Sequence, residues 1–258
     1  MVHPKKHLGQ HFLTDPSIAK RIVDALPVQA GDSVLEIGPG TGILTGPLLE
    51  KDIELRPVEI DPESVAHLNQ RWPELEDRII SGDFLKLDIS AYIKGPFCII
   101  GNFPYNISSQ IFFRVLEHRD RIPVVVCMIQ KEVAGRIVSP PGSREYGILS
   151  VLLQAYYNAE SLFSVRPGSF FPPPKVTSTV IRLTRNQRVS LPCDEDLFTR
   201  VVKTTFNQRR KMIRNSIKSI LLNLGDDLDL LSRRPEQLGV AEFIELTNWV
   251  ASQQREAS

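Results

Sequence analysis

The sequence has few cysteines, no long hydrophobic run and almost no net charge. Of its 258 residues, 31 are Lys or Arg and 30 are Asp or Glu, which gives a net charge of +1. This near-neutral balance excludes proteins whose whole surface binds nucleic acid, so any such site must be local. No apolar stretch reaches the length of a membrane span, and the segment before Leu13 lacks the apolar core of a signal peptide. We therefore expect a cytoplasmic protein.

The three cysteines, Cys98, Cys127 and Cys193, are too far apart to suggest a shared function. No Cys-x-x-Cys pair and no cluster of histidines accompanies them, which leaves no pattern typical of zinc binding. We expect reduced, mostly buried thiols. The rest of the composition is that of an ordinary globular protein, long enough for one large domain and one small one.

Predicted strands and helices alternate along the first two thirds of the chain. Apolar periodicity and turn residues predict strands at 33–37, 54–60, 78–81, 97–101, 124–129 and 179–183. The same signals predict helices at 17–25, 43–51, after 62, and at 108–118, 130–138 and 148–157. Such alternation predicts an α/β fold, in which a mostly parallel, Rossmann-like sheet is covered by helices on both faces.

The remainder of the chain is predicted to be helical. Prolines between Pro167 and Val176 exclude a helix there and predict a rigid loop before the last strand. Beyond it, helices are expected at 194–206, 210–224 and 241–252. With a boundary near 186–192, we predict a large domain over 1–188 and a small all-helical C-terminal domain over 189–258.

A glycine-rich loop follows the first strand of the α/β region. The segment from Glu36 to Gly42, with glycines at 38, 40 and 42, lies at the carboxyl end of that strand, where doubly wound folds bind nucleotide-like ligands. The dinucleotide fingerprint needs a glycine at position 43, which is Ile43, and no Walker lysine follows. The spacing therefore suits a cofactor without phosphates, such as S-adenosylmethionine.

Two acidic residues follow the next two predicted strands. Glu59 could accept hydrogen bonds from both ribose hydroxyls of such a cofactor, and Asp83 from its adenine amino group. Each residue alone is a weak signal, and a turn or a helix cap is the alternative. Because both follow the glycine loop in order, at the ends of successive strands, we predict one shared cofactor site.

The tetrapeptide Asn102-Phe103-Pro104-Tyr105 suggests methylation of an amine. An exocyclic amine on an aromatic base is a poor nucleophile, because its lone pair is delocalised into the ring. The amide oxygen of Asn102 and the carbonyl of Phe103 could accept the two amine hydrogens and favour the pyramidal nitrogen that attacks a methyl donor. Tyr105 could hold the base by its face. The alternative is a strand end followed by a proline turn and a packed tyrosine.

Together these motifs resemble the ribosomal RNA adenine dimethyltransferase family, which includes the small-subunit enzymes and the erythromycin-resistance methyltransferases. The resemblance extends over nearly the whole chain, in order. It rests on Lys6 to Leu13, the glycine loop, Glu59, Gly82-Asp83, the tetrapeptide, Phe170-x-Pro172-x-Pro174-x-Val176 and the helical tail. It implies an S-adenosylmethionine-dependent methyltransferase that needs no metal and releases S-adenosylhomocysteine. The implied product is dimethyladenosine at adjacent adenines of small-subunit (16S) ribosomal RNA, made during subunit assembly.

The resemblance also implies roles for individual residues. Those that would bind the cofactor are His11, Leu13, Gly38, Glu59, Asp83 and Asn102. The family commonly has Asn at the position of His11 and Leu at the position of Phe103. If both residues act through their backbones, these differences leave the chemistry intact.

The target adenine must be unstacked, because a base paired in a helix cannot reach the methyl donor. Tyr105 on one face and Phe170 on the other would form the base pocket. Stacking of this kind is worth about one to three kcal/mol per base. Without the family resemblance, Phe170 would be interpreted as a core residue beside a rigid loop.

A basic segment, residues 203–215, carries five basic residues and no acidic residue. Cations that neutralise phosphates would give a salt-dependent affinity for RNA, although a solvated face is the alternative. The residues predicted to contact RNA are Arg209, Arg210, Lys211 and Arg214. The C-terminal domain is thus predicted to bind RNA, and the domain over 1–188 to carry out catalysis.

The expected partner is small-subunit ribosomal RNA or an assembling small subunit, bound by a monomer that contacts no membrane. The run Arg209-Arg210-Lys211 resembles the small-subunit branch more than the resistance enzymes. The alternatives are a large-subunit RNA methyltransferase of the resistance type, a non-catalytic RNA-binding assembly factor and a methyltransferase of small molecules.

Overall fold

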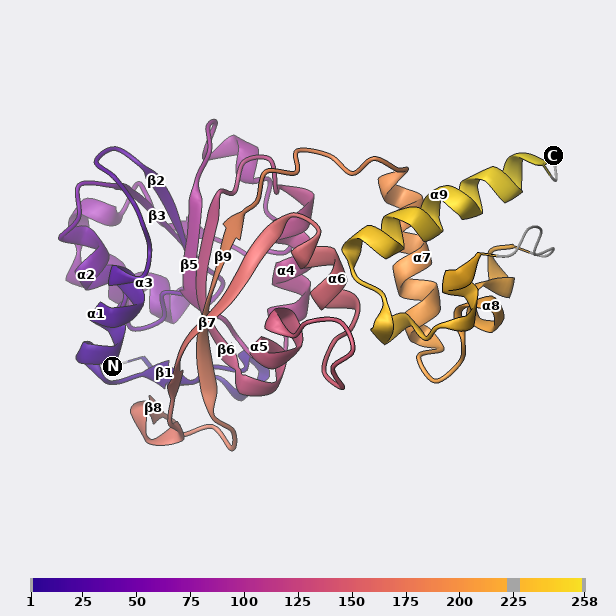
Figure 1. The fold of residues 1–258 in the computed structure, drawn as a ribbon. Coiled ribbons are helices and arrows are strands. Elements are labelled where there is room, and N and C mark those ends of the chain that lie inside the picture. Colours follow the sequence, from indigo (N-terminus) through magenta and orange to yellow (C-terminus); the bar gives the residue numbers. More distant parts are fainter. Residues whose placement is uncertain (1, 222–227, 257–258) are drawn as a thin grey trace. The chain divides into compact units, whose positions relative to one another are not determined.

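The computed structural model describes residues 2–221 and 228–256, which form two compact units (Figure 1). The sheet unit consists of Met1–Ala134 and Ala159–Arg185. The helical unit consists of Gly135–Asn158 and Asn186–Ser258. The tail after 186 therefore shares its compact unit with an internal segment. The functional division at residue 188 stays a prediction.

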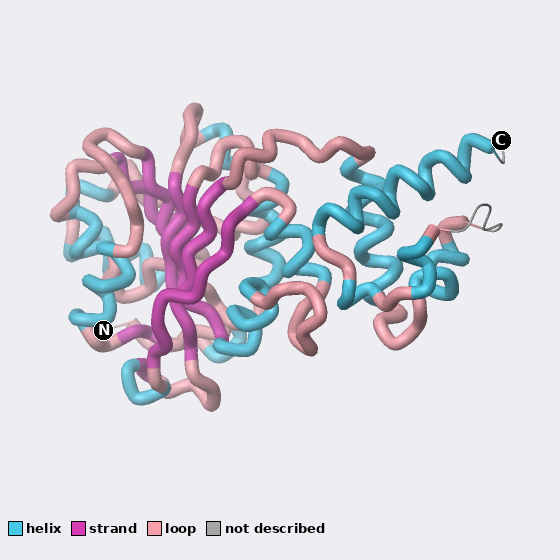
Figure 2. Tube along the Cα trace, in the orientation of Figure 1, coloured by secondary structure: helices cyan, strands magenta, loops and turns pink. Residues whose placement is uncertain are grey.

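A seven-stranded sheet forms the centre of the sheet unit (Figure 2). In spatial order its strands are β4 (Ile80–Ser81), β3 (Glu54–Glu59), β2 (Ser33–Ile37), β5 (Cys98–Asn102), β6 (Val124–Gln130), β9 (Ser178–Arg185) and β7 (Tyr157–Val165). The first five strands pair in parallel, and β9 is antiparallel to β6. Parallel strands bring their carboxyl ends to one edge of the sheet, which is where doubly wound folds bind ligands.

Two helices of the sheet unit, α1 (Pro16–Asp24) and α3 (Pro62–Arg71), start at a side-chain cap. The unit also contains α2 (Thr45–Leu49) and α4 (Ser108–Glu117); α5 (Lys131–Val138) extends from this unit into the helical unit. Asp15 caps α1 by accepting hydrogen bonds from the backbone N–H groups of Ser17 and Ile18, and Asp61 caps α3 through Glu63. A proline follows each cap, at the first helical position, where its missing donor costs nothing.

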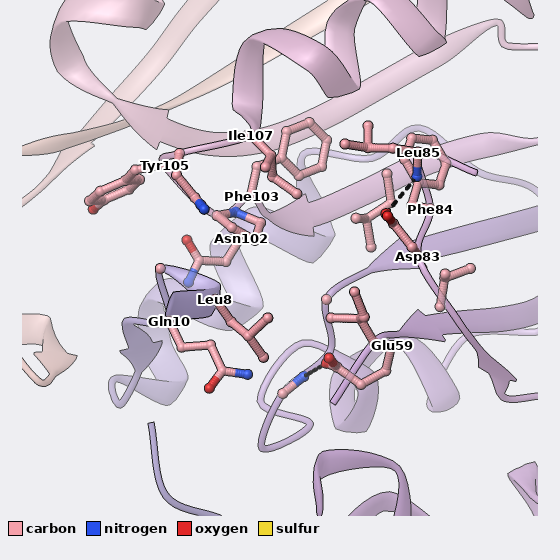
Figure 3. Close-up of a pocket in the computed structure, with 18 of the residues that line it drawn as sticks. Leu8, Gln10, Glu59, Asp83, Phe84, Leu85, Asn102, Phe103, Tyr105 and Ile107 are labelled. Carbon is pink, nitrogen blue, oxygen red and sulfur yellow. Dashed lines mark hydrogen bonds between the residues drawn. The ribbon is translucent and has the colours of Figure 1, made fainter. Parts of the chain in front are cut away.

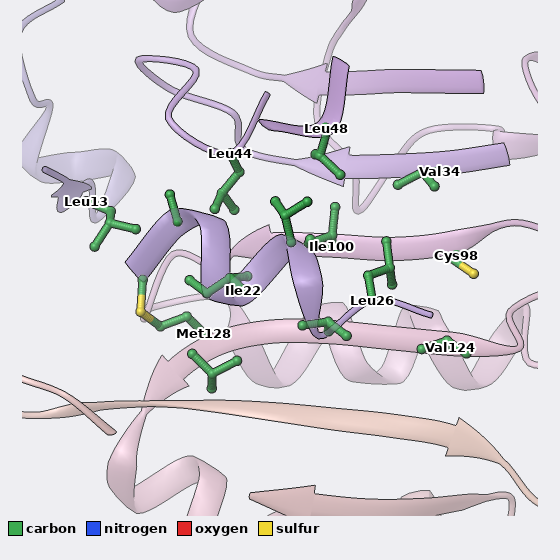
Figure 4. Close-up of a cluster of buried hydrophobic side chains, with 14 of the residues drawn as sticks. Leu13, Ile22, Leu26, Val34, Leu44, Leu48, Cys98, Ile100, Val124 and Met128 are labelled. Carbon is green, nitrogen blue, oxygen red and sulfur yellow. The ribbon is translucent and has the colours of Figure 1, made fainter. Parts of the chain in front are cut away.

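One hydrophobic cluster of the sheet unit lies between α1 and the sheet (Figure 4). Ile22 of α1 packs in this cluster with Val34 of β2, Ile100 of β5 and Met128 of β6. The inner strands are buried along almost their whole length, in agreement with their continuous apolar sequence. This packing fixes the strand ends from which the site is built.

A second, two-stranded sheet joins distant parts of the chain. β1 (Phe12–Leu13) pairs antiparallel with β8 (Phe170–Phe171), so that Leu13 lies opposite Phe170. This pairing was not predicted, because two-residue strands carry no periodicity.

The helical unit contains α6 (Ile148–Gln154), α7 (Glu195–Asn207), α8 (Ile213–Ser216) and α9 (Val240–Glu256). Its core includes the ring of Phe206, which stacks on Phe243 and tilts against Tyr146.

Short 3-10 turns occur in both units, at Lys6–Leu8, Pro73–Leu75, Ile89–Ala91, Pro167–Ser169, Ile217–Ser219, Asp229–Ser232 and Pro235–Gln237. Among the residues described, no helix combines the length and the apolar character needed to cross a membrane.

Two predicted helices differ from the structure. The helix expected at 148–157 ends at Gln154, and Tyr157 begins the unpredicted strand β7, whose mixed burial gives no clear alternation. The helix expected at 210–224 is interrupted, because Met212 is extended and only Ile213–Ser216 is α-helical. Residues 222–224 of that prediction lie outside the described residues.

Candidate active site

A cavity of about 260 Å³ lies at the carboxyl ends of β2, β3, β4 and β5 (Figure 3). This volume is slightly below the roughly 300 to 1,000 Å³ typical of small-molecule sites. The predicted site residues that line it are His11, Gly38, Glu59, Asp83, Asn102, Phe103 and Tyr105. Segments far apart in the sequence therefore meet around one hollow.

The glycine loop supplies a wall without side chains. Gly38 has a φ of 66°, in the left-handed region that favours glycine, and an added Cβ atom would meet no other atom within 4 Å. Gly38 lines the cavity, so the open space beside its backbone is available to a ligand. A ligand can therefore approach the backbone closely here, as the predicted cofactor requires.

Glu59 is held in place by the backbone. Its side chain is 3% exposed, and its two carboxylate oxygens accept hydrogen bonds from Gly40 N–H at 3.0 Å and Asp61 N–H at 2.9 Å. Burial raises the pKa of Glu59. These bonds orient the carboxylate at the cavity wall, and each oxygen keeps a lone pair for a further donor such as a ribose hydroxyl.

Asp83 lies across the cavity from Asn102 and Tyr105 (Figure 3). Its Oδ1 atom accepts a hydrogen bond from Leu85 N–H at 3.0 Å, which fixes the direction of the carboxylate. The cavity therefore offers two oriented carboxylates and a bare glycine backbone, a donor and acceptor set that fits an adenosyl cofactor.

Glu36, in the same motif as the glycines, does not line the cavity. It is fully buried, its Oε2 atom accepts a hydrogen bond from Thr45 Oγ1 at 2.8 Å, and burial raises its pKa to about 8. Its Oε1 atom has no hydrogen-bond partner among the described residues. Glu36 is therefore a core residue next to the cavity, and a ligand in the cavity would not contact it.

The segment from His7 to Gln10 also lines the cavity and was not assigned there from the sequence. Lys5, just before it, pairs with the buried carboxylate of Asp61, and Gln10 Oε1 accepts a hydrogen bond from Lys5 N–H at 2.8 Å. Burial opposes the ionisation of Asp61, but Lys5 and the other donors leave its pKa lowered. In the sequence, only the family resemblance of this N-terminal segment indicated that it lies at the cofactor site.

Asn102 ends β5 with its side chain oriented by the N-terminal segment. Its Nδ2 atom donates a hydrogen bond to the carbonyl of His11 at 2.9 Å. This bond commits the amide nitrogen to the protein and leaves Oδ1 as the acceptor for a ligand. Phe103 is 1% exposed and packs against Phe112, so a ligand could use only its backbone.

Tyr105 is held at its hydroxyl and at its ring. The hydroxyl forms a 2.6 Å hydrogen bond with Ser178 Oγ, and the ring stacks on His11 with centroids 5.4 Å apart. His11 Nδ1 lies 2.7 Å from the carbonyl oxygen of Pro172. Two segments that are distant from Tyr105 in the sequence, at His11 and at Ser178, thus contact this tyrosine.

Leu13 and Phe170 were predicted to lie at the site, but neither lines this cavity. Their side chains are 3% and 4% exposed and belong to the hydrophobic cluster between α1 and the sheet. The pairing of β1 with β8 turns Phe170 into the core and leaves its neighbour Phe171 61% exposed. In this structure the second wall predicted for the base pocket is therefore absent from the cavity.

The basic segment extends from the last turns of α7 into α8 in the helical unit, and its cations have different surroundings. The guanidinium of Arg209 donates a hydrogen bond to Ser143 O at 3.1 Å and lies 3.8 Å from Glu236. Arg210, Lys211 and Arg214 are exposed. Arg209 therefore joins parts of the helical unit, whereas the other three reach solvent.

In the part of the chain that the structure describes, no group of three or more His, Cys, Asp or Glu side chains could hold a metal ion.

The sequence matches known proteins over most of its length. Residues 1–236 match the family described as ribosomal RNA adenine dimethylase. A Flavobacterium johnsoniae protein named ribosomal RNA small subunit methyltransferase A is 58% identical over 250 residues, covering 95% of each chain. A protein of that name from Parabacteroides distasonis is 57% identical over 249 residues, 96% of this chain and 94% of that protein.

Solved structures share the fold. A dimethyladenosine transferase from Plasmodium falciparum matches with a TM-score of 0.81 at 24% identity, over 95% of this chain and 98% of that one. The 23S rRNA methyltransferase ErmE matches with a TM-score of 0.66 at 25% identity, over 93% and 99%. With the parallel sheet and the C-terminal helices, these likenesses confirm the predicted Rossmann-like α/β methyltransferase fold.

Proposed function

Because the chain belongs to the ribosomal RNA adenine dimethylase family, we propose that it dimethylates the exocyclic amines of adjacent adenines in small-subunit ribosomal RNA during subunit assembly. Relatives named as small-subunit methyltransferases, which are 54–58% identical, support this target. The observation that carries the proposal is the orientation of Asn102 at a cavity that also contains the glycine loop and two carboxylates. The cavity thus combines groups suited to a cofactor with an acceptor suited to an amine.

S-adenosylmethionine is the proposed cofactor, and when bound it supplies a methyl group on a positively charged sulfur. Gly38 offers close backbone approach, Glu59 accepts from the ribose hydroxyls, and Asp83 accepts from the cofactor's adenine amine. His11 contributes through its backbone at the methionine end, and Leu13, which does not line the cavity, is a candidate there by family resemblance alone. The buried, oriented Glu59 carboxylate supports this assignment.

The chain's own contribution to the chemistry is to hold the target amine. Asn102 Oδ1 and the Phe103 carbonyl accept its two hydrogens, which localises the nitrogen lone pair and aims it at the methyl group. Such acceptors act most strongly when they need no reorganisation, and the bond from Asn102 Nδ2 to His11 O supports that condition. The proton lost after transfer passes to water.

Tyr105 holds the extruded adenine by stacking. Phe170 is the proposed second wall by family resemblance alone, and its burial at 4% exposure means that it would have to leave the core to serve. The proposal therefore rests on Tyr105 for base binding.

RNA binding is assigned to the exposed cations Arg210, Lys211 and Arg214, with Arg209 as a further candidate from the sequence. Their charge would attract phosphates without specifying a base. A ribosomal RNA substrate implies action in the cytoplasm, and we propose that the protein acts as a monomer.

The test is methyl transfer from labelled S-adenosylmethionine to purified ribosomal RNA and to immature subunits. We expect two methyl groups on each of two adjacent adenines of small-subunit RNA, mapped by mass spectrometry of nuclease fragments. Label in large-subunit RNA alone would favour the resistance-type alternative. RNA binding without transfer, in a protein that binds the cofactor, would favour an assembly factor.

A further inference from the structure

The histidine that departs from the common family residue lies against the proposed base-binding tyrosine. The rings of His11 and Tyr105 are stacked, with centroids 5.4 Å apart and planes inclined by 26°. His11 also lines the cavity and is half-buried. Its side chain therefore contacts Tyr105 rather than standing free at the methionine end of the site.

The histidine ring is itself anchored. The Pro172 carbonyl can only accept a hydrogen bond, so His11 Nδ1, 2.7 Å away, must carry the proton and donate it. Pro172 follows β8, which pairs with β1, and β1 begins directly after His11. The imidazole is thus fixed between a backbone acceptor on one side and a tyrosine ring on the other.

The spacing of the two rings determines where a base can stack. An adenine sandwiched between them would have to stack on both, and a 5.4 Å separation between their centroids leaves no room for a third ring. The face of Tyr105 against His11 is therefore occupied, and the base must use the opposite face. Ser178, whose Oγ atom forms a 2.6 Å hydrogen bond with the hydroxyl, limits displacement of the hydroxyl end of the ring.

Resting on the proposed function, we propose that His11 is a positioning residue that backs Tyr105 and fixes the plane on which the target adenine stacks. Its carbonyl also accepts the hydrogen bond from Asn102 Nδ2. His11 thereby orients both the ring of Tyr105 and the side-chain amide of Asn102, which accepts a hydrogen bond from the target amine. A ring that is already fixed loses less conformational entropy when the base binds.

Three substitutions separate the two side-chain contacts of His11. His11→Phe keeps a ring for Tyr105 but loses the donor to Pro172, His11→Asn keeps a donor but loses the ring, and His11→Ala removes both. His3→Asn is the matched control, since His3 is exposed and does not line the cavity. For each variant, kcat and KM for RNA, the Kd for S-adenosylmethionine and the unfolding midpoint are measured.

We expect His11→Asn and His11→Ala to lower kcat/KM for RNA by about 2- to 10-fold, the effect of losing one aromatic pair, with unchanged cofactor Kd. His11→Phe should retain most of the activity. In a Tyr105→Ala background, His11→Asn should have no further effect, because its action passes through the tyrosine. The control His3→Asn should match the wild type throughout.

Three results would overturn the proposal. A weaker cofactor Kd with unchanged RNA kinetics would make His11 a cofactor residue. An equal loss of activity in the Tyr105→Ala background would remove the link to Tyr105. A gain in kcat/KM would mean that the imidazole occupies the place of the base.

A readout without RNA separates this proposal from the proposed function. The NMR signals of the Tyr105 ring should shift and broaden in His11→Ala and stay near the wild-type positions in His11→Phe. That result would support the positioning role even in a protein that methylates no ribosomal RNA, and unchanged signals in His11→Ala would refute the role.

Discussion

The cavity of the sheet unit and the basic segment of the helical unit use polar groups in opposite ways. Around the cavity, Glu59, Asp83 and Asn102 are buried or half-buried, and each bonds to the backbone. In the basic segment, Arg210 and Lys211 are exposed. The first region fixes the direction of each group, and the second presents only charge.

This difference follows from what each region has to recognise. Aligning an amine with a methyl donor depends on position to within about half an ångström, so side chains must be held by their neighbours. Attraction to phosphates depends on charge and varies little with orientation. Arg209 differs from Arg210 and Lys211, because its bonds to Ser143 and Glu236 give it a structural position.

The largest expected effect tests whether Phe170 belongs to the core or to the base pocket. Phe170→Ala should lower the free energy of unfolding by about 3 to 5 kcal/mol, because it leaves a cavity among packed side chains. Phe171→Ala, at a position that is 61% exposed, should change it by about 0.5 kcal/mol at most. Denaturant titration measures both. Unchanged stability with lost RNA binding in Phe170→Ala would restore Phe170 as a pocket wall.

Asn102→Ala tests the oriented acceptor. It should lower kcat by about 100- to 1,000-fold, equivalent to about 3 to 4 kcal/mol, because one preorganised hydrogen-bond partner of the reacting group is removed. Single-turnover methyl transfer measures the chemical step, and the unfolding midpoint serves as the control for folding. A turnover number equal to that of the wild type would remove Asn102 from the mechanism.

Glu36→Gln tests the cost of burying carboxyl groups near the cavity. The pKa of Glu36 is raised from 4.5 to about 8 by burial, so between these values the folded protein binds one more proton than the unfolded chain. Stability contributed by the protonated group is therefore lost as pH rises through this window. From about pH 5 to about pH 8, the free energy of unfolding of the wild type should fall by on the order of 3 kcal/mol more than that of Glu36→Gln.

Thermal and denaturant unfolding across this pH range measure the difference. Glu50→Gln, at an exposed position of the same charge, should keep the wild-type dependence. Parallel curves for the wild type and Glu36→Gln would show that Glu36 titrates normally in the folded protein.

The smallest expected effects separate the two kinds of cation. Arg209→Ala should lower the free energy of unfolding by about 1 kcal/mol, because it removes a hydrogen bond to Ser143 O and an ion pair. Arg210→Ala combined with Lys211→Ala should leave stability unchanged and reduce the slope of log affinity against log salt by about 0.7 to 0.9 for each phosphate that is no longer neutralised. RNA titrations at several salt concentrations measure the slope.

If Arg209→Ala reduced the salt dependence as much as the double variant did, Arg209 would belong with the exposed cations and the contrast within the segment would disappear.

Local signals in the sequence predicted most of the parallel sheet and its caps. The strand at 33–37 is confirmed as β2 with the same bounds, and Asp61-Pro62 begins α3 as expected. These predictions succeeded because a buried parallel strand is continuously apolar and a capping residue acts on its own first turn. Strand β7 escaped prediction since its partly exposed residues alternate weakly.

Local motifs indicated the kind of chemistry: a glycine loop with the wrong spacing for pyrophosphate, two acids after successive strands, and an Asn-Phe-Pro-Tyr segment. The tertiary structure alone decided which neighbours these residues have. It turned Phe170 into the core, placed His11 against Tyr105 and bonded Arg209 to Ser143. Propensities and caps act between residues a few positions apart, whereas these contacts join residues more than 60 positions apart and exist only once the sheet and the helices have packed.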